Sequence, residues 1–167
     1  MKHIRIALFV VVVALLLSPA GSFAANPHWV VDPYCSLINQ NTLECSGKAA
    51  GLGNLPLYVV VNADAGCTNQ EGTHVIPGKS TSVSGPFTAR FGQFTFGAED
   101  NSGRNRVFAH GPTNCRGRSQ DPFITTSNVT LSIYQCSVGG PTFNAKTGRQ
   151  TNPTCQLLLG PTAASIV

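Results

Sequence analysis

Alternation of apolar and polar side chains is the feature that most constrains the fold of this chain. Residues 57–63 place Leu, Val, Val and Ala on one face, and residues 129–133 place Val, Leu and Ile on one face. Phenylalanine and alanine alternate over 87–91 and again, in the other phase, over 94–98. Successive side chains of a β-strand point to opposite faces, so this period of two predicts strands. Phe91 is expected to share the face of Phe87, and the switch at 92–93 fits a β-bulge or a tight hairpin turn.

Residues that favour turns separate these segments. They lie at 39–42, 51–54, 77–80, 101–103 and 144–148. Helical periodicity is almost absent beyond residue 25, and roughly seven to nine short strands with this spacing are typical of an all-β domain. We expect a disulfide-stapled antiparallel β-sandwich of immunoglobulin-like architecture, with a small Greek-key β-barrel as the alternative.

The first 24 residues have the three regions of a signal peptide. Lys2 and Arg5 precede an uninterrupted apolar run at 6–17, and small residues at Ser22 and Ala24 suit cleavage after Ala24. As a helix the run would span about 18 Å, which is less than the roughly 30 Å of a bilayer core. The sequence therefore predicts an exported protein, extracellular or periplasmic, with no transmembrane segment after cleavage.

Cleavage after Ala24 leaves 143 of the 167 residues, enough for one domain. We expect residues 25–160 to form a single β-sandwich domain and residues 161–167 to form a flexible tail. Without Lys2 and Arg5, nine Lys and Arg face seven Asp and Glu, so the net charge falls from +4 to +2. This charge is too small to predict a nucleic acid as partner.

All six cysteines lie in the exported part, and an even number in an oxidising compartment predicts three disulfides. Residues that face each other across a hairpin are symmetric about its turn. Cys35 and Cys45 are centred on residue 40, and Cys136 and Cys155 are centred near 145.5, each within a predicted turn. Cys45 and Cys67 are also symmetric about a turn, which leaves a second pairing open. The favoured disulfides are Cys35–Cys45, Cys67–Cys115 and Cys136–Cys155.

Three short motifs carry a resemblance to a known group. Cys45-Ser46-Gly47 is followed by Gly-Leu-Gly-Asn at 51–54, an alternating strand, and Cys-Thr-Asn at 67–69. This order resembles small bacterial secreted proteins with a C-S-G, G-L-G-N and C-T-N-x-G pattern, over about a third of the exported chain. The chain departs from that group at Glu71, where a glycine is usual. The resemblance implies a bacterial secreted β domain and no particular activity.

The most charged stretch contains four arginines and one histidine. Two arginines at i and i+2 of a strand share a face, so clustered guanidinium groups could bind sulfate, phosphate or carboxylate on an acidic polysaccharide. A solvated strand edge protected by charge is the alternative. The candidate binding residues are Arg104, Arg106, Arg116 and Arg118.

No catalytic motif, metal motif or cofactor motif is present in the sequence. The zinc spacings C-x-x-C and H-x3–5-H are both missing, and no nucleophile elbow accompanies His110. The sequence therefore favours a non-enzymatic secreted module that binds a glycan or a cell-surface component, or that self-assembles by donating the strand at 25–31. The alternative is a small secreted hydrolase in which His110 acts with Glu99, Asp100 or Asp121.

Overall fold

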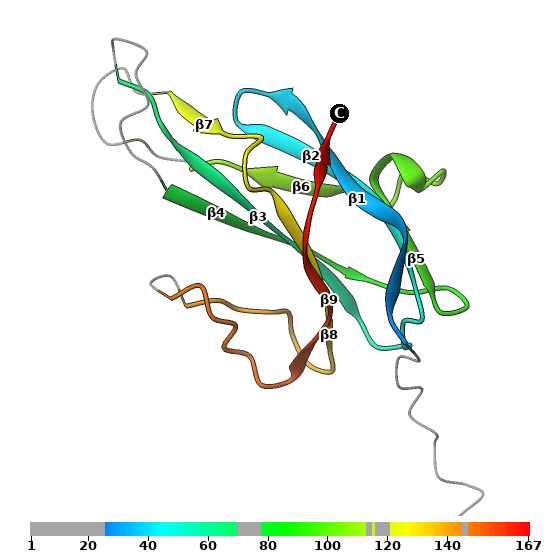
Figure 1. The fold of residues 1–167 in the computed structure, drawn as a ribbon. Coiled ribbons are helices and arrows are strands. Elements are labelled where there is room, and N and C mark those ends of the chain that lie inside the picture. The colour runs from blue at the N-terminus through cyan, green and yellow to red at the C-terminus, as the bar shows by residue number, and fades with distance from the viewer. Residues whose placement is uncertain (1–25, 70–77, 113–114, 116–120, 145–146) are drawn as a thin grey trace, which may run out of the picture.

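The computed structural model describes residues 26–69, 78–112, 115, 121–144 and 147–167. Two β-sheets pack face to face around a shared core, as Figure 1 shows. The β-sandwich expected from the alternating sequence is therefore confirmed. The proposed signal peptide, Met1 to Ala24, lies outside the described residues.

The first sheet holds five strands in the order β10-β1-β2-β5, and β6 also pairs with β2. All of its pairings are antiparallel except β10 with β1, which is parallel. Its strands are β1 (His28–Asn39), β2 (Thr42–Ala50), β5 (Gln93–Phe96), β6 (Val107–His110) and β10 (Ser165–Ile166).

The second sheet is fully antiparallel, with the order β4-β3-β8-β9 and with β7 paired to β3. Its strands are β3 (Leu57–Cys67), β4 (Gly78–Phe87), β7 (Pro122–Ile124), β8 (Thr130–Cys136) and β9 (Cys155–Ala163). The short 3-10 helix η1 (Gly97–Glu99) follows β5. In the described part of the chain, no helix is long and apolar enough to cross a membrane.

The core consists of the alternating apolar side chains that face inward from both sheets. Val59 and Val61 of β3 are fully buried, as are Leu131 and Ile133 of β8. The rings of Phe94 and Phe96 stack with centroids 5.5 Å apart. Burial of a side chain of this kind contributes about 1.5 to 3 kcal/mol, so the inward faces hold the two sheets together.

The structure contains the three disulfides favoured from the sequence: the two hairpin pairs and the remaining pair, Cys67–Cys115. Cys35 and Cys45 are register partners on β1 and β2, and Cys136 and Cys155 are register partners on β8 and β9. The bond between Cys67 and Cys115 ties the end of β3 to the segment that follows β6. The short turn between β1 and β2 fixes which of their residues face each other, and the longer β8–β9 connection stays symmetric because its own residues pair, as Phe143 does with Gln150.

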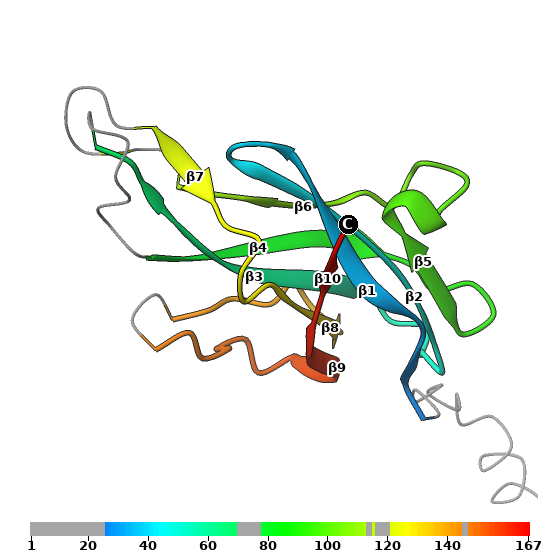
Figure 2. The same ribbon diagram turned by 45° about the horizontal axis from the view of Figure 1, so that its top comes forward.

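The expectation of a flexible tail at 161–167 is wrong. Strand β9 continues to Ala163, and β10 pairs Ser165 with Tyr34 of β1. Figures 1 and 2 show this red segment leaving the second sheet and crossing to the first. The amide of Ala164 donates to the carbonyl oxygen of Val129 and that of Val167 donates to the carbonyl oxygen of Cys35, so backbone hydrogen bonds hold the segment in place.

Side-chain hydrogen bonds connect the two sheets along another edge, where β4 runs beside β6 (Figure 2). The hydroxyl of Ser80 donates to the carbonyl oxygen of His110, and the amide of His110 donates to Ser82 Oγ at 3.1 Å. The polar strand β4 thus satisfies the backbone of a strand in the opposite sheet.

Candidate functional site

A groove of about 450 Å³ opens where the end of β4 and strand β5 meet the loop that follows η1. We call it the β5 groove. Phe87 and Phe94, whose ring centroids are 5.1 Å apart, contribute its aromatic side chains, while most of the other lining residues are polar. The lining residues are Pro86, Phe87, Thr88, Arg90, Gln93, Phe94, Thr95, Asp100, Ser102, Arg104 and Asn105.

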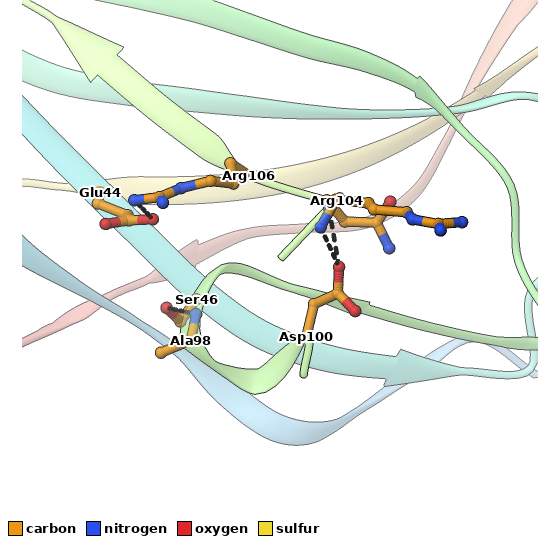
Figure 3. Close-up of polar contacts among 7 residues, drawn as sticks. Glu44, Ser46, Ala98, Asp100, Arg104 and Arg106 are labelled. Carbon is orange, nitrogen blue, oxygen red and sulfur yellow. Dashed lines mark hydrogen bonds and ion pairs between the residues drawn. The ribbon is translucent and has the colours of Figure 1, made fainter. Parts of the chain in front are cut away.

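The carboxylate of Asp100 organises one wall of the β5 groove. It accepts hydrogen bonds from the backbone amides of Ser102 at 3.1 Å, Arg104 at 3.0 Å and Asn105 at 2.8 Å. The hydroxyl of Ser102 also donates to it at 2.7 Å. Figure 3 shows Asp100 below the backbone of Arg104, with the bonds drawn as dashed lines. One side chain therefore fixes the path of the loop that carries Arg104.

These bonds also set the charge state of Asp100. The hydrogen bond from the Asn105 amide, followed by that from the Ser102 hydroxyl, lowers the pKa of the Asp100 carboxyl below its usual value. Donors that favour the ionised form have this effect on any carboxyl group. Asp100 is thus an anion that is already solvated by the protein's own backbone.

A second set of bonds attaches the loop to β5. The side-chain amide of Asn105 donates to the carbonyl oxygen of Thr95 at 2.9 Å, and the amide of Gly97 donates to the carbonyl oxygen of Asn105 at 2.8 Å. The amide of Ala98 donates to Ser46 Oγ of β2 at 2.8 Å. The groove wall is therefore joined to two strands of the first sheet, β5 and β2.

The predicted row of Arg104 and Arg106 is not formed. Both residues precede β6 in irregular backbone, so the strand rule that would place them on one face does not apply. Figure 3 shows their side chains pointing in opposite directions. Arg106 forms an ion pair with Glu44 and lies over the ring of Phe108, 5.1 Å from its centroid. Arg104 instead lines the β5 groove, and Arg116 and Arg118 lie outside the described residues.

Arg90, which was not among the arginines predicted to bind, also lines the β5 groove. Arg90 and Arg104 are both exposed, and neither forms an ion pair with a carboxylate of the described residues. Arg90 is 14 positions from Arg104, so spacing within one strand could not have linked them. The groove therefore contains two guanidinium groups and one carboxylate, and that carboxylate is occupied by its own loop.

Phe91 occupies the tip of the hairpin between Arg90 and Gln93. The two flanking residues pair by hydrogen bonds of 2.8 and 2.9 Å, which leaves a two-residue turn of Phe91 and Gly92. Both have positive φ, +52° and +72°, as a type I′ turn requires. The expectation that Phe91 shares a strand face with Phe87 is wrong, because Phe91 lies in this turn and is fully exposed.

The residues of the alternative hydrolase have separate partners. Nδ1 of His110 lies 3.3 Å from the hydroxyl of Thr42. The carboxylate of Glu99 accepts a hydrogen bond from the hydroxyl of Tyr34 at 3.0 Å, and the carboxylate of Asp100 accepts hydrogen bonds from the backbone of its own loop. In the described segments, no group of three or more His, Cys, Asp or Glu is placed to hold a metal ion. No described feature joins His110 to a carboxylate.

The segment expected to donate a strand is already used within the fold. Residues 28–31 begin β1, where His28 and Trp29 pair with Ala50 and Ala49 of β2. The indole of Trp29 also donates to Thr162 Oγ1 at 2.9 Å. Donation of this segment to another copy would require the chain to unpair its own first sheet.

Comparisons with protein-family models, with curated proteins and with solved structures found no match for this chain.

Proposed function

We propose that the protein is a secreted, non-enzymatic module that binds an acidic polysaccharide in the β5 groove. The observation that carries this proposal is the pair Arg90 and Arg104, which line one groove and have no described carboxylate as ion-pair partner. A guanidinium group offers several N–H donors in a fixed plane, and this geometry fits the two oxygens of a carboxylate or sulfate.

The other lining residues suit a polyhydroxylated ligand. Thr88, Gln93 and Asn105 offer hydroxyl and amide groups along the groove. Binding sites of this type combine apolar surface with a few directed polar groups. Pro86 and the partly buried Phe87 contribute the apolar part, since Phe94 beneath them belongs to the core.

The fixed position of Arg104 also supports binding. Because Asp100 holds the Arg104 amide, this arginine loses less backbone freedom when it contacts a ligand than it would in an unrestrained loop. The carboxylate of Asp100 repels an anion in the groove, but its charge is stabilised by three backbone amides that face it.

Export is part of the same proposal. Three disulfides persist in oxidising compartments, and the apolar run at 6–17 has the length of a signal-peptide core. An extracellular or periplasmic location would expose the groove to polysaccharides of a cell surface.

Binding of polygalacturonate and of dextran sulfate at low ionic strength tests this function. The Arg90→Ala/Arg104→Ala variant should bind at least tenfold more weakly, since a hydrogen bond to a charged group contributes about 1.5 to 3 kcal/mol. The matched control is Arg106→Ala/Arg149→Ala, which removes the same charge from outside the groove and should bind nearly as the wild type does.

Salt gives a second readout, because the Debye length falls from about 10 Å at 0.1 M to about 3 Å at 1 M. Affinity should therefore fall steeply over this range. Equal losses in the two double variants would indicate diffuse attraction and reject the groove as the site. An absence of binding to both polysaccharides would reject the proposed function.

A further inference from the structure

The backbone conformation of Phe91 is unfavourable for its residue type. A non-glycine residue at φ +52° lies in the left-handed region, where the β-carbon approaches the backbone, and only Asn, Asp and Gly are common there. The first position of a type I′ turn is normally Asn or Asp before Gly. The chain has Gly92 at the second position and a bulky aromatic residue at the first.

The environment of Phe91 gives no folding benefit in return. Its side chain is 105% exposed, the largest value among the exposed apolar residues of the described chain. Scattered apolar side chains on a surface need no explanation, but one in a strained turn with no packing partner does. Backbone strain of this kind is concentrated at ligand-binding sites, so Phe91 is a candidate ligand contact.

The position of the turn relates Phe91 to the β5 groove. Arg90 and Gln93, the pair that closes the turn, both line the groove. The amide of Leu52 donates to the carbonyl oxygen of Gly92 at 3.0 Å, so the hairpin tip is anchored to the loop after β2. The anchored tip therefore carries Phe91 and Gly92 between two residues that line the groove, Arg90 and Gln93.

We propose that Phe91 is a stacking platform for a pyranose ring of the ligand, and that the β5 groove recognises acidic sugars rather than polyanions in general. This inference rests on the proposed function. An aromatic ring has an apolar face with a negative quadrupole, and the C–H face of a pyranose ring packs on such a surface. The residues next to Phe91 in sequence are Arg90 and Gly92, so the hairpin tip adds no apolar area of the size that a protein interface requires.

Two probes separate ring recognition from charge recognition. Polygalacturonate carries one carboxylate on each pyranose ring, and linear polyphosphate carries comparable charge without any ring. Phe91→Ala should weaken polygalacturonate binding by about threefold to tenfold, the range expected for loss of one aromatic stacking contact, and should leave polyphosphate binding unchanged. Phe91→Trp should retain polygalacturonate binding.

Phe91→Asn provides a variant that is expected to fold better than the wild type. It places Asn-Gly in the turn, so the midpoint of thermal unfolding should rise by about 2 to 6 °C while polygalacturonate binding falls as in Phe91→Ala. An unchanged or lower midpoint would remove the argument from strain. Val138→Asn, at another exposed apolar position, is the matched control and should change neither binding nor the midpoint by a comparable amount.

The failure of this inference is distinguishable from failure of the proposed function. Polygalacturonate binding that needs Arg90 and Arg104 but not Phe91 would overturn the stacking role alone. Equal losses of polyphosphate and polygalacturonate binding in Phe91→Ala would also overturn it. Binding to anionic lipid vesicles that needs Phe91, with unchanged polygalacturonate binding, would assign the side chain to a lipid surface instead.

Discussion

Replacement of Asp100 by Asn should destabilise the groove wall without a large change in shape. The wild-type carboxylate uses one oxygen for the amide of Ser102 and the other for the amides of Arg104 and Asn105. Asparagine has only one accepting oxygen, so one side of this arrangement would place an NH2 group against an N–H donor.

The size of the loss follows from these bonds. Hydrogen bonds to a charged acceptor contribute about 1.5 to 3 kcal/mol, and neutral ones contribute about 0.5 to 1.5 kcal/mol. Losing one of these hydrogen bonds and weakening two others would lower the free energy of unfolding by about 2 to 3 kcal/mol in a buried site. Because the loop is open to solvent, we expect a smaller decrease of about 1 to 2 kcal/mol, similar to that for removal of a helix cap. Urea unfolding of Asp100→Asn should report this decrease in the free energy of unfolding.

The matched control is Asp32→Asn, which removes an exposed carboxylate from β1. Amide hydrogen exchange should show faster exchange at Arg104 and Asn105 in Asp100→Asn only. Equal unfolding free energies in the two variants, together with unchanged protection at Arg104 and Asn105, would refute the role assigned to Asp100.

The same residue predicts a pH dependence with a definite sign. The pKa of Asp100 is lowered in the folded state, whereas an unfolded Asp has a pKa of about 3.9. Its stabilising contribution is therefore complete above about pH 4 and is lost as the pH falls through the folded-state pKa. The difference in unfolding free energy between wild type and Asp100→Asn should shrink on acidification from pH 7 to 2.5, and a growing difference would contradict the assignment.

Three further measurements test other parts of the structure. Cys136→Ser/Cys155→Ser opens a loop with a sequence separation of 19, so the free energy of unfolding should fall by about 3 kcal/mol in a non-reducing urea titration. Gly97→Ala should destabilise the fold by more than about 1 kcal/mol in the same assay, because φ is +65° and a β-carbon would lie 2.2 Å from Ser46 Oγ. Arg106→Ala should change the free energy of unfolding by less than about 1 kcal/mol, since its ion pair is partly solvated.

The core strands were predictable because their signal is local. Leu131 and Ile133 are fully buried and alternate with Thr130, Ser132 and Tyr134, and burial on one face is what produces such alternation. Strand β4 gave a weaker signal, since residues 79–82 are Lys, Ser, Thr and Ser, and they form a strand by pairing with β3 and by bonding to His110. These partners come from tertiary structure, which a period of two does not encode.

The candidate site was only partly predictable. Arg104 was selected from its charge, but its grouping with Arg106 assumed a strand that Asp100 prevents by holding the backbone of 104–105 in an irregular path. Arg90 and Phe91 were missed because their distance from Arg104 in the sequence gives no sign of proximity. The sequence Phe91-Gly92 could have indicated the turn, since Gly suits the second position of a type I′ turn.

The parallel pairing of β10 with β1 has a consequence for how the chain reaches this structure. The partners Tyr34 and Ser165 of this pairing are 131 positions apart, and Trp29 of β1 is hydrogen-bonded to Thr162 of β9 at a separation of 133. Contacts between such distant segments give a high contact order, and all-β domains of this kind fold in milliseconds to seconds rather than microseconds. Until β10 docks, the outer edge of β1 has unpaired backbone groups that another chain could extend. The slow closure of this edge is therefore the interval in which aggregation would compete with folding.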